Sequence, residues 1–246
     1  GDFKNNKKNG KGIFVWSDGS SYEGTWKDDT PHGKGIYAWI NGDQYEGFFN
    51  EGYLDGTGTF FYANNDQYEG SFSSGQKSGY GKYFIANGNV YEGDFVDGQP
   101  NGAGIFTFND GTRYEGGFSD GKFYGDGSLY INQGKSSSMV YTGSWDGTNK
   151  LPKMASILFE NGDLFEGETD GNGRPTSNGE WTTLAERESG EKTPLKQDSI
   201  HKANEFYKKH KESIETAVLI TSSALTVLSL IPVTAPVAAP LLIGLN

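Results

Sequence analysis

Cysteine is absent from the 246-residue sequence, which excludes disulfide bonds and cysteine-ligated zinc sites. Hydrophobic residues make up only 34% of the chain, yet aromatic residues reach 14% and glycine occurs 37 times. A disordered chain would be poor in aromatic side chains. The composition therefore predicts an extended structure with a thin aromatic interior, in which glycine permits turns and close packing.

Basic residues are scarce in the first three quarters of the sequence. Residues 1–182 hold 14 Lys and Arg against 25 Asp and Glu, whereas residues 183–246 hold seven of each, so the net charge of −11 lies entirely on the first part. Such a surface repels nucleic-acid phosphates and anionic lipid headgroups. The charge pattern disfavours nucleic acid as a partner and direct lipid contact by residues 1–182.

Motifs for catalysis, metals or cofactors are also missing. The three histidines have no cysteine partners and no metalloprotease spacing, and no serine stands in a Gly-x-Ser-x-Gly elbow. The Gly-x-Gly pairs recur at a fixed interval without the Lys-Ser/Thr of a phosphate-binding loop. We therefore predict no catalytic, metal or cofactor site and expect a protein that is not an enzyme.

A tripeptide repeats through most of the chain. Tyr-Glu-Gly begins at intervals of 23 residues at Tyr22, Tyr45, Tyr68, Tyr91 and Tyr114, and related tripeptides begin at Tyr141 and Phe165. With the tyrosine as position 1, positions 12 and 14 are glycines, positions 16 and 18 are mostly aromatic, and positions 20 and 21 are usually Asn-Gly or Asp-Gly, which favour tight hairpin turns.

Alternation along strands predicts one aromatic face per copy. Positions 1, 3 and 5 point to one side of a strand, and positions 14, 16 and 18 do the same on the next strand. A single hairpin cannot bury this face, so the copies are expected to stack. We predict that rings at positions 5 and 18 bind a partner: Trp16, Trp39, Tyr62, Phe108, Trp26, Phe49, Phe72 and Phe95.

The position-2 glutamates fall on the opposite face. They form a row at Glu23, Glu46, Glu69, Glu92, Glu115 and Glu166. A cation site is conceivable there, but carboxylates one copy apart are more often solvated or paired with lysines.

The pattern resembles the MORN (membrane occupation and recognition nexus) repeat over roughly residues 1–182. The resemblance implies a mainly β fold, an elongated solenoid of stacked antiparallel hairpins with about eight copies, the first truncated and the last degenerate. It also implies a scaffold or tether, at times attached to a catalytic domain. The later copies depart from the pattern, as with Pro152 and Met154 in place of paired glycines, and are interpreted as the closing end of the array.

The rest of the chain has a different composition. Residues 183–199 are interpreted as a polar linker and residues 200–246 as an amphipathic helix that runs into an uncharged hydrophobic tail. A helix is expected between about 194 and 231. The residues predicted to pack on protein or to contact a membrane are Ile200, Tyr207, Ile214, Val218, Leu225 and Leu228.

Three functional hypotheses follow. The first is a non-catalytic scaffold that binds a protein partner, or its own C-terminal helix, on the aromatic face, with the tail anchored to a membrane or to another chain, including another copy. The second is a targeting module of a larger enzyme, effector or toxin. The third makes the tail itself a membrane-inserting element. The chain shows no signal peptide, so we expect a cytoplasmic or membrane-associated location.

Overall fold

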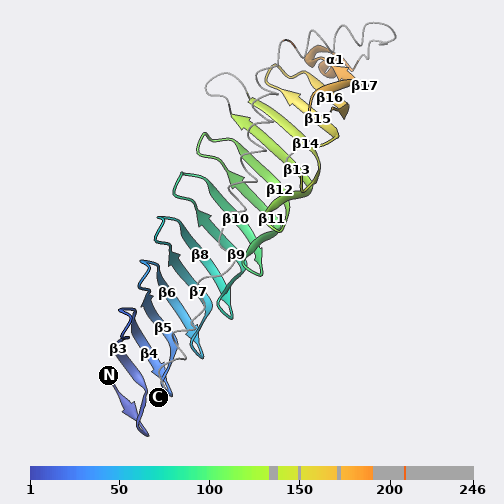
Figure 1. Cartoon of the computed structure of the whole chain (residues 1–246). Coiled ribbons are helices and arrows are strands. Elements are labelled where there is room, and N and C mark those ends of the chain that lie inside the picture. The colour runs from blue at the N-terminus through green and yellow to red at the C-terminus, as the bar shows by residue number, and fades with distance from the viewer. Residues whose placement is uncertain (133–137, 149–150, 171–172, 191–207, 209–246) are drawn as a thin grey trace. The chain divides into compact units, whose positions relative to one another are not determined.

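The computed structural model describes residues 1–132, 138–148, 151–170, 173–190 and 208. Figure 1 shows a succession of antiparallel strands, and the described residues end in a short helix, α1. The chain divides into two compact units at Asn101 and Gly102, and each is described by itself.

In the first unit, neighbouring strands along the sequence are also neighbours in the sheet, from β3 to β10. A separate two-stranded hairpin, β1 and β2, precedes them. The bounds are β1 Phe3–Lys4, β2 Lys7–Lys8, β3 Gly10–Val15, β4 Ser21–Lys27, β5 Thr30–Ala38, β6 Gln44–Asn50, β7 Tyr53–Phe61, β8 Gln67–Ser73, β9 Gln76–Phe84 and β10 Val90–Val96.

The second unit continues the same up-and-down order. Strand β11 begins in the first unit and continues into the second. The bounds are β11 Gln99–Thr107, β12 Arg113–Ser119, β13 Lys122–Asn132, β14 Ser138–Asp146, β15 Met154–Phe159, β16 Leu164–Thr169, β17 Pro175–Thr182 and α1 Leu184–Ser189. The prediction of a mainly β protein made of stacked antiparallel hairpins is confirmed.

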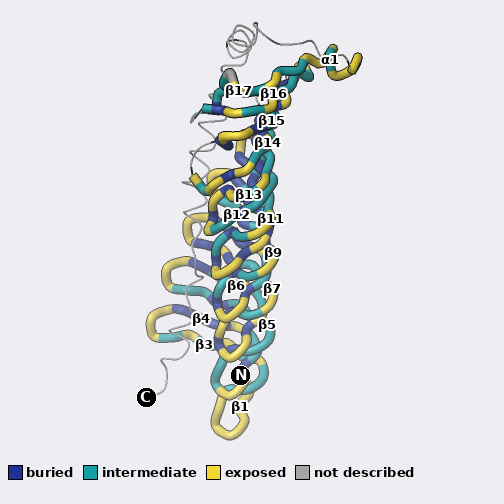
Figure 2. The backbone as a smooth tube through the Cα atoms, turned by 90° about the vertical axis from the view of Figure 1, so that its right-hand side faces the viewer, coloured by how far each residue is buried: buried dark blue, intermediate teal, exposed yellow. Residues whose placement is uncertain are grey.

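Two kinds of turn alternate along the first unit. The Asn-Gly and Asp-Gly steps place glycines such as Gly19 and Gly42 at a φ of 94°, as the sequence predicts. The opposite turns, at positions 7 and 8, differ in having positive φ at both residues, for example at Asp28 (49°) and Asp29 (72°). Two consecutive residues with positive φ form the tight turn whose twist suits a hairpin. Figure 2 shows exposed residues at these turns.

Tyrosine and glycine recur in the Tyr-Glu-Gly motif for a structural reason. The register of β4 against β5 shifts between Gly24 and Trp26, where the single residue Thr25 of β4 faces residues 32–34 of β5 and has no partner in that ladder. The ring of Tyr22 lies over Gly24, where a Cβ would overlap it, and its hydroxyl donates a hydrogen bond to the carbonyl oxygen of Thr25 at 2.9 Å. The same bond recurs from Tyr45, Tyr68, Tyr91 and Tyr114. Glycine therefore makes room for the ring, and tyrosine supplies a donor for the backbone carbonyl at the register shift.

Rings of successive copies interlock on one face. Tyr22 contacts Trp26 of its own copy and Phe49 of the next, both at 5.0 Å between centroids and nearly perpendicular. Tyr45 repeats this arrangement with Phe49 and Phe72. Edge-to-face pairs at this spacing are favourable. The position-1 tyrosines are fully buried, so the core of the first unit is this row of rings.

Buried polar side chains join successive hairpins at the Asn/Asp-Gly turns. A carboxylate oxygen of Asp43 accepts a hydrogen bond from the backbone N–H of Ala63 at 2.8 Å, and Asp66 accepts one from Ala86 at the same distance. Each acceptor lies one copy away from its donor. These bonds fix the spacing of neighbouring copies where no strand pairing can do so.

A short helix that the sequence analysis did not predict follows the last strand. α1 spans Leu184–Ser189, inside the segment interpreted as a polar linker. Its cause is a capping box: the Thr183 hydroxyl accepts from the N–H of Glu186, and the Glu186 carboxylate accepts from the N–H of Thr183. Gly190 ends it with a φ of 69°. The predicted tail helix lies outside the described residues.

Candidate functional site

A row of glycines crosses the strands of the first unit. Cross-strand neighbours in the register join Gly12, Gly24, Gly35, Gly47, Gly58 and Gly70 in that order. We call this row the glycine track. Tyrosine rings cover it on one face: a Cβ at Gly58 would lie 2.5 Å from Cζ of Tyr45. The opposite face of the track carries no side chain, so its backbone forms a bare floor.

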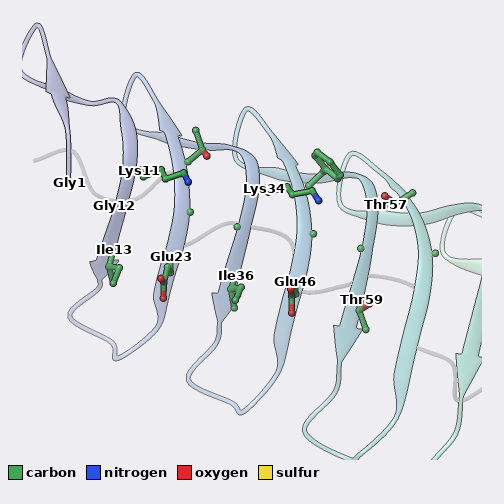
Figure 3. A pocket seen from close by; sticks show the side chains of 17 residues that line it. Gly1, Lys11, Gly12, Ile13, Glu23, Lys34, Ile36, Glu46, Thr57 and Thr59 are labelled. Atoms are coloured by element: carbon green, nitrogen blue, oxygen red, sulfur yellow. The ribbon is translucent and has the colours of Figure 1, made fainter.

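Side chains on both sides of the track turn this floor into a groove. One row, which we call the lysine wall, consists of Lys11, Thr25, Lys34, Phe48 and Thr57. The other, the glutamate wall, consists of Ile13, Glu23, Ile36, Glu46 and Thr59. Figure 3 shows the glutamate wall as one residue per strand, opposite Lys11, Lys34 and Thr57. The groove has a volume of about 1090 Å³.

The strand register explains why isoleucine and glutamate alternate along the glutamate wall. Ile13 is the cross-strand partner of Glu23, Glu23 of Ile36, and Ile36 of Glu46. Positions 15 and 2 therefore fall side by side on successive strands. On the lysine wall, Nζ of Lys34 lies 5.2 Å from the centre of the Phe48 ring. In the described part of the chain, no ion pair joins Lys11 or Lys34 to either glutamate across the track.

A side-chain bridge between β9 and β10 lies beyond β8, the last strand that lines the groove. Tyr80 occupies the lysine-wall side and Glu92 the glutamate-wall side, and the Tyr80 hydroxyl donates a 2.5 Å hydrogen bond to the Glu92 carboxylate. Lys82, beside Glu92, forms an ion pair with it at 3.1 Å. The hydrogen bond from Tyr80, together with Lys82, holds the pKa of Glu92 below its ordinary value. The bridge lies beyond Gly70, where the glycine track ends, and would block an occupant of the groove from extending further.

The rings predicted to bind a partner lie in and around the core. The position-5 residues Trp26, Phe49, Phe72 and Phe95 are at most 4% exposed, and Tyr62 and Phe108 are also buried. Trp16 and Trp39 are half-buried, and Nε1 of Trp39 is buried with no hydrogen-bond partner in the described residues. The role of these rings in binding stays a prediction. Sequence reasoning placed the glutamates on the opposite face but missed the groove, because it ignored positions 4, 13 and 15.

Comparison with protein families identifies the repeat. The MORN repeat model matches residues 1–21, 22–44, 45–67, 68–90 and 91–113. Residues 1–113 are five consecutive MORN repeats. The first unit, with its groove, lies within the matched region, and the tyrosine-over-glycine arrangement recurs beyond it at Tyr114, whose ring lies over Gly116 and Gly127.

Comparison with other proteins adds little to the MORN assignment. No curated protein matches the chain. Among solved structures, the TCP domain of SAS-4 (dCPAP) of Drosophila melanogaster, in complex with a proline-rich motif of Ana2 (dSTIL), is 14% identical with a TM-score of 0.37, over 70% of this chain and 90% of that one. The wild-type TCP10 domain of Danio rerio CPAP is 13% identical with a TM-score of 0.21, over 70% and 94%. Both likenesses are too weak to indicate a shared fold or partner.

One MORN copy carries a lysine inside the ring core. Position 10 is apolar in most copies, as at Pro31, Leu54 and Pro100, but it is Lys77 in β9, which is fully buried. Its Nζ donates a 3.3 Å hydrogen bond to the Tyr62 hydroxyl. Burial lowers the pKa of Lys77 to about 7. A charged ammonium in this place is costly, because water is replaced by aromatic rings.

Other predicted features concern segments that the structure describes only in part. Ile200, Tyr207, Ile214, Val218, Leu225 and Leu228 lie outside the described residues. Within the described ranges, no helix is both long and apolar enough to cross a bilayer. The same ranges contain no cluster of three or more His, Asp or Glu side chains arranged to hold a metal ion.

Proposed function

We propose that this MORN-repeat protein is a non-catalytic scaffold whose first unit binds an extended segment of a protein partner in the groove along the glycine track. The observation that carries the proposal is the groove itself: a bare backbone floor between two walls of different chemistry. The floor lets a partner's main chain approach closely, because glycine has no side chain in the way. The walls supply the contacts that distinguish one partner from another.

Exposure of the wall residues supports this choice of face. Ile13 is 67% exposed and Phe48 is 39% exposed, whereas the rings of the opposite face are mostly buried. Concave surfaces with exposed apolar groups among a few polar ones are typical of binding sites. The charges of Lys11, Lys34, Glu23 and Glu46 surround these apolar groups and are placed to select a partner by complementarity.

A peptide-selection experiment tests this function. A phage-displayed library of random 12-residue peptides is selected on the full 246-residue chain, and the affinities of the selected peptides are measured by fluorescence anisotropy. We expect Ile13→Asp and Lys34→Glu to weaken them about tenfold or more. Ile40→Asp and Lys27→Glu are matched controls, because Ile40 is 71% exposed and Lys27 is exposed, both outside the groove.

Two results would redirect the proposal. Selected peptides that keep their affinity for both groove variants would contradict it. If they instead lose affinity on Trp16→Ala and Trp39→Ala, the aromatic face is the binding surface, as the sequence analysis predicts.

The predicted role of residues 200–246 as an anchor is tested separately. We propose that any membrane association depends on this tail, because the charge of residues 1–182 is −11. Liposome flotation of the full chain should be lost when residues 216–246 are deleted. Flotation of the truncated chain would show that the repeats bind lipid. A catalytic domain elsewhere in a longer parent protein would make the chain a targeting module without changing the groove.

A further inference from the structure

The chemistry of the partner can be inferred from the spacing of the groove, an inference that rests on the proposed function. Each copy contributes two antiparallel strands, and neighbouring strands lie about 4.8 Å apart, so equivalent wall residues recur about every 9.6 Å. Lys11 and Lys34 are one copy apart on the lysine wall, as are Glu23 and Glu46 on the glutamate wall. An occupant that contacts equivalent residues in successive copies needs the same repeat distance.

Among regular backbone conformations, polyproline II fits this distance best. It rises about 3.1 Å per residue with three residues per turn, so one turn spans about 9.3 Å. Two turns of an α-helix span about 10.8 Å, so their mismatch with the repeat of about 9.6 Å is about four times the mismatch of polyproline II. A β-strand covers a similar length in about three residues, but three is an odd number, so successive contacts would come from opposite faces of the strand.

The floor also favours a ligand with few backbone donors. The glycine track lies within antiparallel ladders, so its N–H and C=O groups bond the neighbouring strands. A peptide pressed onto this floor therefore finds few hydrogen-bond partners there, and each desolvated N–H of the peptide carries a cost. Proline has no N–H to desolvate and already holds the φ of polyproline II.

The walls specify the other two side-chain columns of such a ligand. A polyproline II helix presents three columns of residues, and one facing the floor leaves one for each wall. Lys11 and Lys34 complement acidic residues in the first of these columns. Glu23 and Glu46, alternating with Ile13 and Ile36, complement basic residues with long apolar stems in the second.

We propose that the groove binds a proline-rich segment in the polyproline II conformation, one turn per MORN copy, with acidic residues along the lysine wall and basic residues along the glutamate wall. The segment lies across the strands from β3 to β8. It ends before the bridge between Tyr80 and Glu92, which lies beside the paired Gly81 and Gly93, beyond the end of the track at Gly70.

The test compares three labelled 12-residue peptides on the full chain by fluorescence anisotropy. The first is four copies of Glu-Pro-Lys, which places each residue type in its own column. The second contains the same residues in an order without a three-residue period. The third is four copies of Glu-Ala-Lys, which keeps the charges but favours a helix. We expect the first to bind at least tenfold more tightly than either of the others, and Lys34→Glu to weaken it about tenfold while Lys27→Glu changes it less than twofold.

Equal affinities for the first and second peptides would overturn the inference. If the Glu-Ala-Lys peptide binds more tightly than the Glu-Pro-Lys peptide and is weakened by Lys34→Glu, the groove binds peptides but not polyproline II, so the proposed function survives without this inference. Tighter binding of a peptide of residues 232–246, which holds Pro232, Pro236 and Pro240 and no charge, would overturn the charge assignment. No binding by any of the peptides also overturns the inference, while the library selection decides the proposed function independently.

Discussion

The two faces of the first unit arise from one repeat but differ in how uniform they are. On the ring face, position 1 is a fully buried tyrosine in every copy from Tyr22 to Tyr91. On the groove face the residue type varies between copies. Position 13 is occupied in turn by Lys11, Lys34, Thr57 and Tyr80, and position 15 by Ile13, Ile36, Thr59 and Lys82. The ring face is restricted because each ring fills space between two copies. The groove face is free to vary because its side chains meet solvent.

The difference separates stability from recognition. Substitutions on the ring face are expected to change the free energy of unfolding, because they alter a close-packed interior. Substitutions on the groove face are expected to change binding with little effect on folding, because surface positions seldom contribute more than about 0.5 kcal/mol. Substitutions at matched positions of the two faces test this difference.

The largest effect is expected from removal of a core ring. Phe72→Ala deletes a ring that is 3% exposed and contacts Tyr45 and Tyr68, and it should lower the free energy of unfolding by about 3–5 kcal/mol. Glu69→Ala, three residues earlier on the groove face, should cost about 0.5 kcal/mol or less. Urea unfolding followed by tryptophan fluorescence measures both. Equal losses would show that the faces are wrongly assigned.

The buried lysine should make stability depend on pH. The pKa of Lys77 is about 7 in the folded protein, below the ordinary 10.5, so between these values the unfolded chain binds more protons than the folded one. Stability should therefore rise with pH, by about 3 kcal/mol between pH 7 and about pH 9.5, before unfolded tyrosines begin to ionise. In Lys77→Met this rise should disappear, and the variant should be the more stable protein at pH 7. An unchanged rise in the variant would assign the pH dependence to other groups.

A methyl group added to the glycine track should lower stability more than a substitution at the neighbouring wall position. In Gly58→Ala the new Cβ would point to the ring face and overlap Tyr45, so unfolding should become easier by about 1–3 kcal/mol. Thr57→Ala, the preceding residue on the lysine wall, is the control and should cost about 0.5 kcal/mol or less. Thermal unfolding compares the two. A harmless Gly58→Ala would mean that Tyr45 can move aside, and the track would not be needed for packing.

The smallest effect concerns the bridge that limits the groove. Tyr80→Phe removes the hydrogen bond to Glu92 from a side chain that is 61% exposed, so global stability should hardly change. The pKa of Glu92, held low first by Tyr80 and then by Lys82, should move up toward its ordinary value. Side-chain NMR titration of Glu92 in the two proteins measures this shift. If the titration midpoint of Glu92 is unchanged in Tyr80→Phe, the prediction is wrong and Lys82 alone keeps the pKa of Glu92 low.

Much of the fold could be predicted because each copy carries its own local signals. The 23-residue interval, the alternation of rings and glycines, and the Asn/Asp-Gly turns indicate stacked hairpins with one aromatic face. Local signals were also present, but overlooked, at the capping box of Thr183 and Glu186. The second turn of each hairpin was overlooked as well, although a glycine with positive φ stands there in several copies, as at Gly52, Gly75 and Gly98. The pair Asp28 and Asp29 adopts positive φ without a glycine and gives no such signal.

The sequence by itself determined the repeat, the strand alternation and the identity of the buried tyrosines, because these follow from neighbours along the chain and from the need to cover an aromatic face. Tertiary structure alone decided the groove and its limits. Strand register alone places residues 11 and 34 on the same wall and residues 80 and 92 within hydrogen-bond distance, because it brings positions from different strands to one face of the sheet. The register shift at Thr25 and the placement of Lys77 among three tyrosine rings also depend on contacts between strands. Such contacts join residues that are distant in sequence, and no local propensity encodes their geometry.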